Sequence, residues 1–363
     1  MECYGLSTRS LRLCGYALGL ILLTSCDYIL YIRWVQTMKN YRWYAGSLVF
    51  PLFGTLFFWI PVWFNRYYRG HQYTTEAGFS QRKLFMLGTF DSLNSILGTY
   101  ATPYLSVLLM TILDKLTLPL TMVVSIVYLG RQYLPVHYLG ATLTLYGVGI
   151  SFIPNFDQGE QIRNAVWLAI YILSLVPAVA SYCYKEHHLK TVDLDIWWMN
   201  AWISVWQIVF GVLTIPVVFA SPPVGEGISG SGFGEYFLRA SRCQFANQGT
   251  VPTDQCQNSF WYFISYQLVS TLCNVIMFMI IREESSVVYQ VINTLKMPIT
   301  AWLGASVYLV GDQAQAIGPA DIFSFVGIAL GVYIYNREPE KQRPTRLMDW
   351  DDTLQLPLRS SSI

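Results

Sequence analysis

The chain has 363 residues, of which 53% are hydrophobic, 16% are aromatic and only 12% are charged. Soluble domains carry about 25% charged residues, so a soluble fold of this length would lack the polar side chains that cover its surface. The 23 Lys and Arg nearly balance the 22 Asp and Glu, which argues against a nucleic-acid-binding protein. The apolar content also excludes a disordered chain. These values indicate a polytopic membrane protein.

Ten apolar stretches set the predicted fold. A membrane-spanning helix needs roughly 20 mainly apolar residues, and the stretches are of about that length. They cover residues 13–32, 43–64, 84–100, 105–129, 136–153, 165–184, 196–220, 260–281, 286–310 and 322–335. The sequence therefore predicts an all-α integral membrane protein with about ten transmembrane helices.

The fourth and fifth predicted spans resemble the ninth and tenth. Residues 116–121 (LTLPLT) align with residues 295–300 (LKMPIT), with Pro and Thr in matching positions. The repeat divides the chain into a first half, residues 1–155, and a second half, residues 156–337. Five spans in each half is an odd number, so the two halves are expected to insert with opposite orientation. Such inverted repeats are typical of transporters, whose binding site lies at the membrane midplane between the halves.

An even number of spans places both termini on one side of the membrane. Assigning that side to the cytosol puts most Lys and Arg of the loops there, in agreement with the positive-inside rule. Residues 185–188 (KEHH) then form a solvated cytosolic turn. The polar residues 338–363 are expected to form a cytosolic tail without regular structure.

One long loop, residues 221–259, is expected on the non-cytosolic side. It begins with the Gly-rich residues 225–234, which predict a flexible linker, and it contains Cys243 and Cys256. That side of a vacuolar or secretory membrane is oxidising, so we expect a disulfide; two free thiols are the alternative in a plastid-type membrane. The loop has no His and is not expected to bind zinc. No cofactor or metal is predicted, and the chain shows no enzyme motif such as a nucleophile elbow or a dinucleotide fingerprint.

Several short motifs, in order, are similar to those of the chloroquine-resistance-transporter-like family of the drug/metabolite transporter superfamily. They are Phe90-Asp91-Ser92-Leu93, Pro119-Leu120-Thr121-Met122-Val123-Val124-Ser125, Tyr138-Leu139-Gly140-Ala141, Pro177, Tyr184-Lys185-Glu186, Asp193-Leu194-Asp195, Asn200-Ala201-Trp202 and Pro298. The resemblance implies ten helices in two inverted halves, with a cavity lined by the first to fourth and sixth to ninth helices. It also implies export of small solutes from an acidic vacuole, or exchange across a plastid-type membrane. The chain departs from the family at Asp114-Lys115, where relatives tend to carry Gln, so the substrate's charge is not implied.

Five Asp and Lys residues fall within predicted spans, namely Asp27, Asp91, Asp114, Lys115 and Lys296. An ionised side chain at the centre of a membrane helix costs roughly 2.5–3.5 kcal/mol, so these residues are expected to face protein or a water-filled cavity. The repeat aligns Asp114, Thr117 and Thr121 with Asn293, Lys296 and Thr300, and the spacing of each trio defines one helix face. A structural ion pair between Asp114 and Lys296 is the alternative to a role in the cavity.

The predicted substrate-binding residues share intramembrane position and polarity. They are Asp27, Asp91, Asn94, Asp114, Lys115, Thr121, Gln207, Asn293, Lys296 and Thr300. Because a carboxylate in a low-dielectric cavity takes up protons more readily, Asp114 and, second, Asp91 are the candidates for proton coupling.

The predicted function is that of a non-enzymatic secondary transporter. It moves amino acids, short peptides or cationic drugs across an organellar membrane by alternating access, with proton-coupled efflux from an acidic vacuole. Its predicted partners are a small solute, protons and the lipid bilayer. The alternative cargo of an exchanger is glutathione or another thiol, a nucleotide sugar or a sugar phosphate, although Asp91 and Asp114 would repel phosphate. A membrane receptor or scaffold with a sensing lumenal loop is the alternative from another class.

Overall fold

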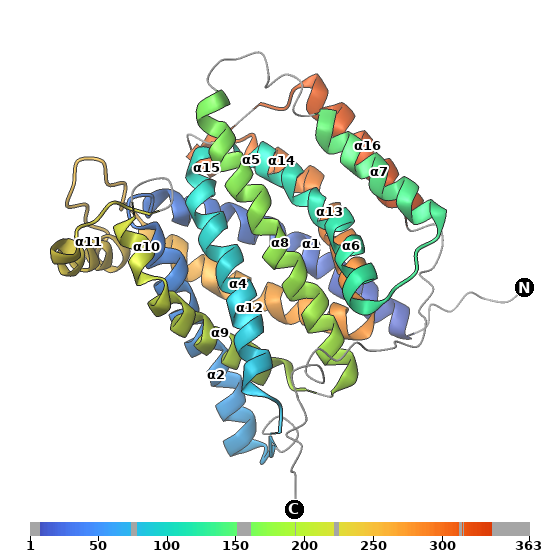
Figure 1. The fold of residues 1–363 in the computed structure, drawn as a ribbon, viewed down its shortest axis with the longest axis horizontal. Coiled ribbons are helices and arrows are strands. Elements are labelled where there is room, and N and C mark those ends of the chain that lie inside the picture. The colour runs from blue at the N-terminus through green and yellow to red at the C-terminus, as the bar shows by residue number, and fades with distance from the viewer. Residues whose placement is uncertain are drawn as a thin grey trace, which may run out of the picture.

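The computed structural model describes residues 8–73, 78–150, 161–192, 194–220, 225–311, 314 and 316–335, and the secondary-structure elements of this part of the chain are all helices (Figure 1). The predicted tail, residues 338–363, lies outside the described residues. The α-helices are α1 (Thr8–Thr37), α2 (Phe50–Tyr68), α4 (Gln81–Ala101), α5 (Val107–Leu113), α6 (Thr117–Leu129), α7 (Pro135–Ile150), α8 (Gln161–Thr191), α9 (Ile196–Leu213), α10 (Ile215–Phe219), α11 (Phe233–Ala246), α12 (Ser259–Glu283), α13 (Ser286–Leu295), α14 (Met297–Gly304), α15 (Val307–Val310) and α16 (Pro319–Tyr335). Shorter helical turns are η1 (Tyr44–Val49), η2 (Thr102–Tyr104), η3 (Asp114–Leu116) and η5 (Gly230–Gly232).

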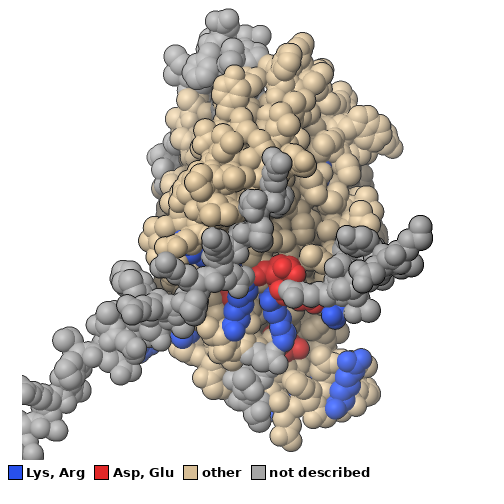
Figure 2. Space-filling view, turned by 90° about the vertical axis from the view of Figure 1, so that its right-hand side faces the viewer, with Lys and Arg blue, Asp and Glu red and all other residues tan. Residues whose placement is uncertain are grey.

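Among the described residues, six helical segments are long and apolar enough to cross a membrane. They are Gly15–Thr37, Tyr44–Tyr68, Val107–Leu129, Ala165–Thr191, Ile196–Leu213 and Ser259–Glu283. Helices α4, α7, α13 to α15 and α16 occupy the remaining predicted segments. The face in Figure 2 shows a broad surface without charged side chains above a band in which acidic and basic residues gather. The prediction of an all-α membrane protein is confirmed.

The helices pack in pairs that lie far apart in the sequence. Helix α1 contacts α12, α2 contacts α9, and α4 contacts both α8 and α9. Two broken segments cross, so that α5 contacts α14 while α6 contacts α13. Helices α7 and α16 form a separate pair at one edge of the bundle, visible at the upper right of Figure 1.

Glycines bring α7 and α16 into backbone contact. A Cβ atom added at Gly140 would lie only 2.6 Å from the carbonyl oxygen of Gly331, and one added at Gly147 would lie 2.9 Å from that of Ser324. Membrane helices approach this closely where small residues line the crossing, because dispersion contacts rather than the hydrophobic effect hold them together. The order of these contacts shows that α7 and α16 run antiparallel.

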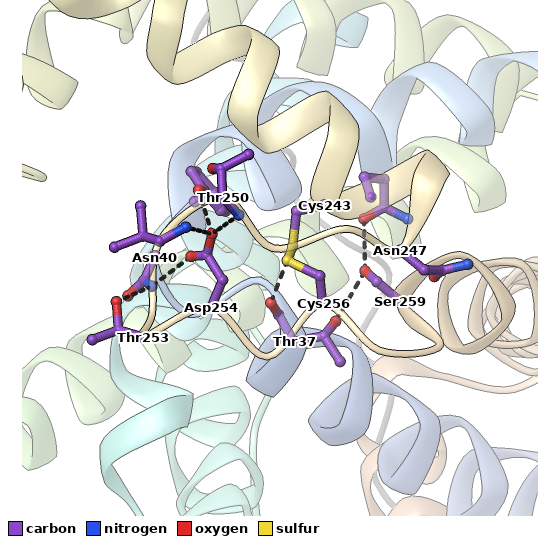
Figure 3. Close-up of a disulfide and its surroundings, with 12 residues drawn as sticks. Thr37, Asn40, Cys243, Asn247, Thr250, Thr253, Asp254, Cys256 and Ser259 are labelled. Atoms are coloured by element: carbon purple, nitrogen blue, oxygen red, sulfur yellow. Dashed lines mark hydrogen bonds between the residues drawn. A yellow bond between two sulfur atoms is a disulfide. The ribbon is translucent and has the colours of Figure 1, made fainter.

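The connection between α10 and α12 is tied down by a disulfide. Cys243 of α11 and Cys256 form this bond, which confirms the predicted pairing, and Figure 3 shows it beside Thr37 at the end of α1. Both cysteines are buried. The Gly-rich stretch is more ordered than predicted, because the backbone N–H groups of Glu226 and Ile228 donate to the carbonyl of Val218 at 3.2 and 3.3 Å.

Asp254 fastens the same connection to the end of α1. Its carboxylate accepts hydrogen bonds from Asn40 Nδ2 at 2.8 Å, Tyr41 Oη at 3.0 Å and the backbone N–H groups of Thr250 and Val251 at 2.9 and 3.0 Å (Figure 3). Partial burial acts to raise the pKa of Asp254, but these hydrogen bonds outweigh it and hold the pKa below its ordinary value. The stability that Asp254 contributes is therefore present above its unfolded-state pKa and is lost as the pH falls through the lowered value.

The glycine crossing yields the first prediction. Gly140→Ala places a methyl group against the α16 backbone and is expected to lower stability by about 1–3 kcal/mol, since overpacking forces the helices apart. The measurement is the thermal unfolding midpoint of the purified protein in detergent. Gly149→Ala is the matched control, because it lies on the same helix with nothing within 4 Å of the added Cβ. Equal shifts for the two variants would contradict the close crossing.

The disulfide yields the second. Cys243→Ser opens a loop with a sequence separation of 13 residues, and the lost cross-link is expected to lower stability by about 3 kcal/mol through the entropy of the unfolded chain. A reducing agent should lower the unfolding midpoint of the unmodified protein and leave that of the variant unchanged. The prediction is wrong if the reducing agent shifts both equally, or shifts neither.

Candidate functional site

A cavity of about 330 Å³ lies inside the bundle. It is lined by residues of α1, α2, α4, η3, α6, α8, α9, α12 and α13 together with Lys296, while α7 and α16 contribute no lining residue. This is the set of helices that the resemblance implied. The volume lies at the small end of the range of ligand pockets, roughly 300–1,000 Å³, and therefore suits a small solute.

Most of the predicted substrate-binding residues meet at this cavity. Those that line it are Asp27, Asp91, Asn94, Asp114, Gln207, Asn293 and Lys296. Lys115, Thr121 and Thr300 do not line it. The sequence alone placed Thr121 on one helix face with Asp114, and Thr300 on another with Lys296.

These three residues have partners in the protein instead. Lys115 is 1% exposed, and its Nζ donates to the carbonyl oxygen of Asn293 at 3.2 Å. Thr121 donates to the carbonyl of Thr117 at 2.6 Å, and Thr300 to that of Lys296 at 3.1 Å. The face prediction assumed one continuous helix through each segment, and both helices are interrupted there.

The interruptions fall at matching places in the two similar sequence segments, residues 116–121 and 295–300. A short 3₁₀ turn, η3, separates α5 from α6, and Lys296 separates α13 from α14. Pro119 and Pro298 follow the two breaks. Each proline favours an interruption there, because it lacks the N–H that would continue the helix and clashes with the preceding turn. Lys115 lies at one break, and its ammonium group binds a carbonyl beside the other, so the two interruptions support each other.

Asp91 forms a buried ion pair with Lys185. The ammonium of Lys185 in α8 donates to both carboxylate oxygens of Asp91 in α4, at 2.8 and 3.1 Å, and Ser181 Oγ donates to Oδ1 at 2.5 Å. The side chain of Lys185 is 4% exposed, and that of Asp91 is 21% exposed. The pair neutralises the wall of the cavity that α4 and α8 form.

The predicted cytosolic turn at residues 185–188 is wrong, because α8 continues through these residues to Thr191. Glu186 is 1% exposed and forms ion pairs with Arg131 and, at 2.9 Å, with Lys190. Its second oxygen accepts from the backbone N–H of Ser286 at 2.9 Å and from the Ser286 hydroxyl at 2.6 Å. Glu186 thus joins the segment after α6, helix α8 and the start of α13.

Asp114 has a neutral partner. Tyr171 of α8 donates to its Oδ1 at 2.7 Å. Among the residues that the structure describes, no cation forms an ion pair with Asp114, so the predicted alternative of a structural pair with Lys296 is not what the structure contains. Asp114 therefore presents a carboxylate to the cavity with a single side-chain hydrogen bond.

Asp27 and Lys296 line the cavity without an ionic partner. Within the described chain neither forms an ion pair, and Asp27 Oδ1 is buried without a hydrogen-bond partner. Three side-chain amide atoms are also buried without a hydrogen-bond partner in the described structure, namely Gln267 Oε1, Gln290 Nε2 and Asn293 Oδ1. Since buried polar atoms normally have partners, these atoms mark the part of the cavity where water or a ligand binds.

Sequence reasoning missed Lys185, Ser181 and Tyr171. Lys185 was assigned to the cytosol from its place after an apolar run, and Ser and Tyr are too frequent in such runs to attract attention. Three Asp and two Lys side chains of the described residues line the cavity. The second of these bases, Lys185, lies in the two turns by which α8 extends beyond the predicted span. Hydropathy did not show this extension. In the structure α8 has 31 residues, which exceeds the roughly 20 that a bilayer requires.

The fold and the site together define a polytopic helical membrane protein with an internal polar cavity. The family described as CRT-like, chloroquine-resistance transporter-like, matches residues 13–335, and the chain belongs to this family. It is 24% identical over 278 residues to Crt homolog 1 of Dictyostelium discoideum, covering 70% of this chain and 59% of that protein. It is 22% identical over 346 residues to the chloroquine resistance transporter of Toxoplasma gondii, covering 91% and 38%.

The relatives also include a plant protein. The protein CLT3, chloroplastic, of Arabidopsis thaliana is 22% identical over 320 residues, covering 86% of this chain and 69% of that protein. The chain spans 59% and 38% of the lengths of the Dictyostelium and Toxoplasma relatives. The recognition made from short motifs is confirmed.

The ion pair yields a prediction on stability. Asp91→Asn leaves Lys185 buried without a counter-charge and is expected to destabilise the protein by about 3 kcal/mol, at the low end for a broken buried pair because Asp91 is partly exposed. Adding Lys185→Met removes the stranded charge and should restore much of that loss. The measurement is the thermal unfolding midpoint of the two single variants and the double variant. Additive effects of the two substitutions would contradict a direct pair.

Proposed function

We propose that this protein is a secondary transporter that moves small polar or amphipathic solutes across an organellar membrane by alternating access. Amino acids, short peptides and cationic drugs are its cargo, and its direction is efflux from an acidic, vacuole-like compartment, driven by protons. The observation that carries the proposal is the polar cavity at the two helix breaks. Discontinuous membrane helices at corresponding positions of two repeats are the usual site of substrate binding in transporters.

The proposed architecture is ten membrane spans in two inverted halves, residues 1–155 and 156–337, with both termini in the cytosol. The packing of the repeat-related segments supports it. The first part of one broken span contacts the second part of the other in both directions, α5 with α14 and α6 with α13. The antiparallel contact of α7 with α16 is likewise what a two-fold axis in the membrane plane would produce.

The lumenal position of the connection between α10 and α12 is supported by its disulfide, since such bonds persist in oxidising compartments. A plastid location, as the printed name of the Arabidopsis relative suggests for that protein, would require the bond to form under less oxidising conditions.

Asp114 is the proposed proton-coupling residue. It lines the cavity, and its side chain accepts a single hydrogen bond, from a neutral phenol. The titratable groups that face it are Tyr28 and Tyr31 of α1, Tyr171 and Tyr182 of α8 and the neighbouring Lys115. Asp91 is a weaker candidate, because its carboxylate is already bound in an ion pair with Lys185.

Uptake into proteoliposomes tests the transport itself. Purified protein is reconstituted and offered labelled amino acids, dipeptides, glutathione and a cationic quinoline, with and without a proton gradient. Transport predicts that at least one solute enters faster than into protein-free vesicles, and that it does so in a saturable manner. Absence of flux for every solute, in both gradient directions, would overturn the proposal.

The pH dependence tests the role of Asp114. Asp114→Asn preserves the size of the side chain and removes its titratable proton, so uptake should become equal with and without the gradient while solute binding is retained. Glu235→Gln is the control, because Glu235 is an exposed acid on α11 and its loss should leave the gradient dependence intact. An Asp114→Asn protein that still follows the gradient would remove Asp114 from the coupling mechanism.

A further inference from the structure

The walls of the cavity differ in how far their charges are satisfied. On the side of α4 and α8, Lys185 and Ser181 neutralise and hydrogen-bond Asp91. On the side of α1, α12 and α13, the described structure leaves several polar groups without partners. A ligand gains most by binding where it replaces missing partners, since unpaired buried groups carry the full cost of desolvation.

The unsatisfied wall contains one charge of each sign. Asp27 of α1 has its Oδ1 buried without a partner, and the groups that act on it are the Lys296 ammonium and the Ser270 hydroxyl. Lys296 is 8% exposed, and its Nζ lies 5.3 Å from the ring centroid of Tyr28, the residue next to Asp27. Helix α1 contacts both α13 and α14, the helices on either side of Lys296. Asp27 and Lys296 therefore line adjacent walls of the same cavity, yet they do not form an ion pair in the described structure.

We propose that Asp27 and Lys296 form a two-point site for a zwitterionic solute, whose ammonium group binds Asp27 and whose carboxylate binds Lys296. A solute with both groups restores partners to both side chains at once. A purely cationic solute leaves Lys296 unpaired, and a purely anionic one leaves Asp27 unpaired, which costs binding free energy in each case.

Neutral groups beside the two charges complete the site. Tyr28 Oη, Gln290 Nε2 and Asn293 Oδ1 are buried without hydrogen-bond partners in the described structure. Asn293 lies one turn before Lys296, and Tyr28 follows Asp27, so these groups flank the charges on the same two segments. The cavity volume of about 330 Å³ suits a solute of the size of an amino acid or a dipeptide.

This site names the substrate class of the proposed transporter and rests on that proposal, but its test is a binding measurement. Purified protein in detergent is titrated calorimetrically with L-leucine, with L-leucinamide, which lacks the carboxylate, and with N-acetyl-L-leucine, which lacks the ammonium. The same three forms of glycine control for the side chain. In the unmodified protein the zwitterion of at least one series should bind about tenfold more tightly than either singly charged form, as the loss of one charge-assisted hydrogen bond predicts.

The variants divide the two contacts. Asp27→Asn should weaken the zwitterion and the amide about tenfold and leave the acetylated form unchanged, and Lys296→Gln should weaken the zwitterion and the acetylated form and leave the amide unchanged. Asp27→Glu and Lys296→Arg keep the charges and should retain the preference, which distinguishes a contact from a folding defect. Glu235→Gln is the control on α11.

Two results would overturn the proposal. One is that the unmodified protein binds the three forms with equal affinity, or binds neither zwitterion. The other is that Asp27→Asn and Lys296→Gln each abolish binding of all three forms, while Asp27→Glu and Lys296→Arg bind all three forms with equal affinity. Uptake into proteoliposomes remains a separate measurement. Zwitterion binding without uptake would refute the transporter, and uptake of singly charged solutes without zwitterion binding would refute the site alone.

Discussion

Every ionisable side chain inside the membrane-spanning helices needs a counter-charge, a hydrogen bond or water, and this requirement organises the bundle. Asp91 with Lys185 and Glu186 with Arg131 meet it through pairs that join different helices. Because α8 supplies one member of each pair, this single helix links α4, the segment after α6 and the start of α13. In the described structure, Asp27, Asp114 and Lys296 line the cavity without an ion pair, and water or a solute can reach them there. Lys115 also lacks an ion pair, but it lies outside the cavity and binds the carbonyl oxygen of Asn293.

The two prolines determine where that cavity forms. A continuous helix through either broken span would pair its backbone N–H and C=O groups within the helix. Only its side chains would then be free to bind a solute in the cavity. The breaks at η3 and at Lys296 free backbone carbonyls in the middle of the bundle, and Lys115 binds one of them, Asn293 O. The interruption therefore takes Lys115 out of the set of groups available to a solute, and it turns Thr121 and Thr300 to their own helices. What remains at the breaks is Asp114 on one side and Asn293 and Lys296 on the other.

The sequence predicts the elements better than their ends. Apolar length locates the helices of the described chain, and the position of Cys243 and Cys256 in one loop predicts their bond. These sequence patterns fail at Lys185, because a polar run after an apolar one is typical of a loop. The ion-pair partners that Lys185 and Glu186 have in the folded protein, Asp91 and Arg131, are distant in sequence. The sequence patterns fail again at Thr121 and Thr300, where a continuous helical period was assumed across a proline. Both errors have one physical source, since long-range pairing and local helix breaks do not appear in hydropathy.

The charges of the cavity wall formed by α4 and α8 are paired, whereas those of the wall formed by α1, α12 and α13 are not. This difference bears on how the solute and the proton would be coupled. With Asp91 and Lys185 neutral as a pair, the cavity retains two carboxylates, Asp27 and Asp114, and one ammonium group, Lys296. Lys115, the residue next to Asp114, does not line the cavity and binds the carbonyl oxygen of Asn293. A zwitterion bound at Asp27 and Lys296 adds no net charge, so the residues that line the loaded cavity still carry the charge of Asp114. Moving that net charge through a low-dielectric bundle is unfavourable, and a proton on Asp114 removes it. On the two proposals together, the zwitterion accounts for the charges of one wall and the proton for the charge that is left, so coupling follows from the number of unpaired groups without a separate gate.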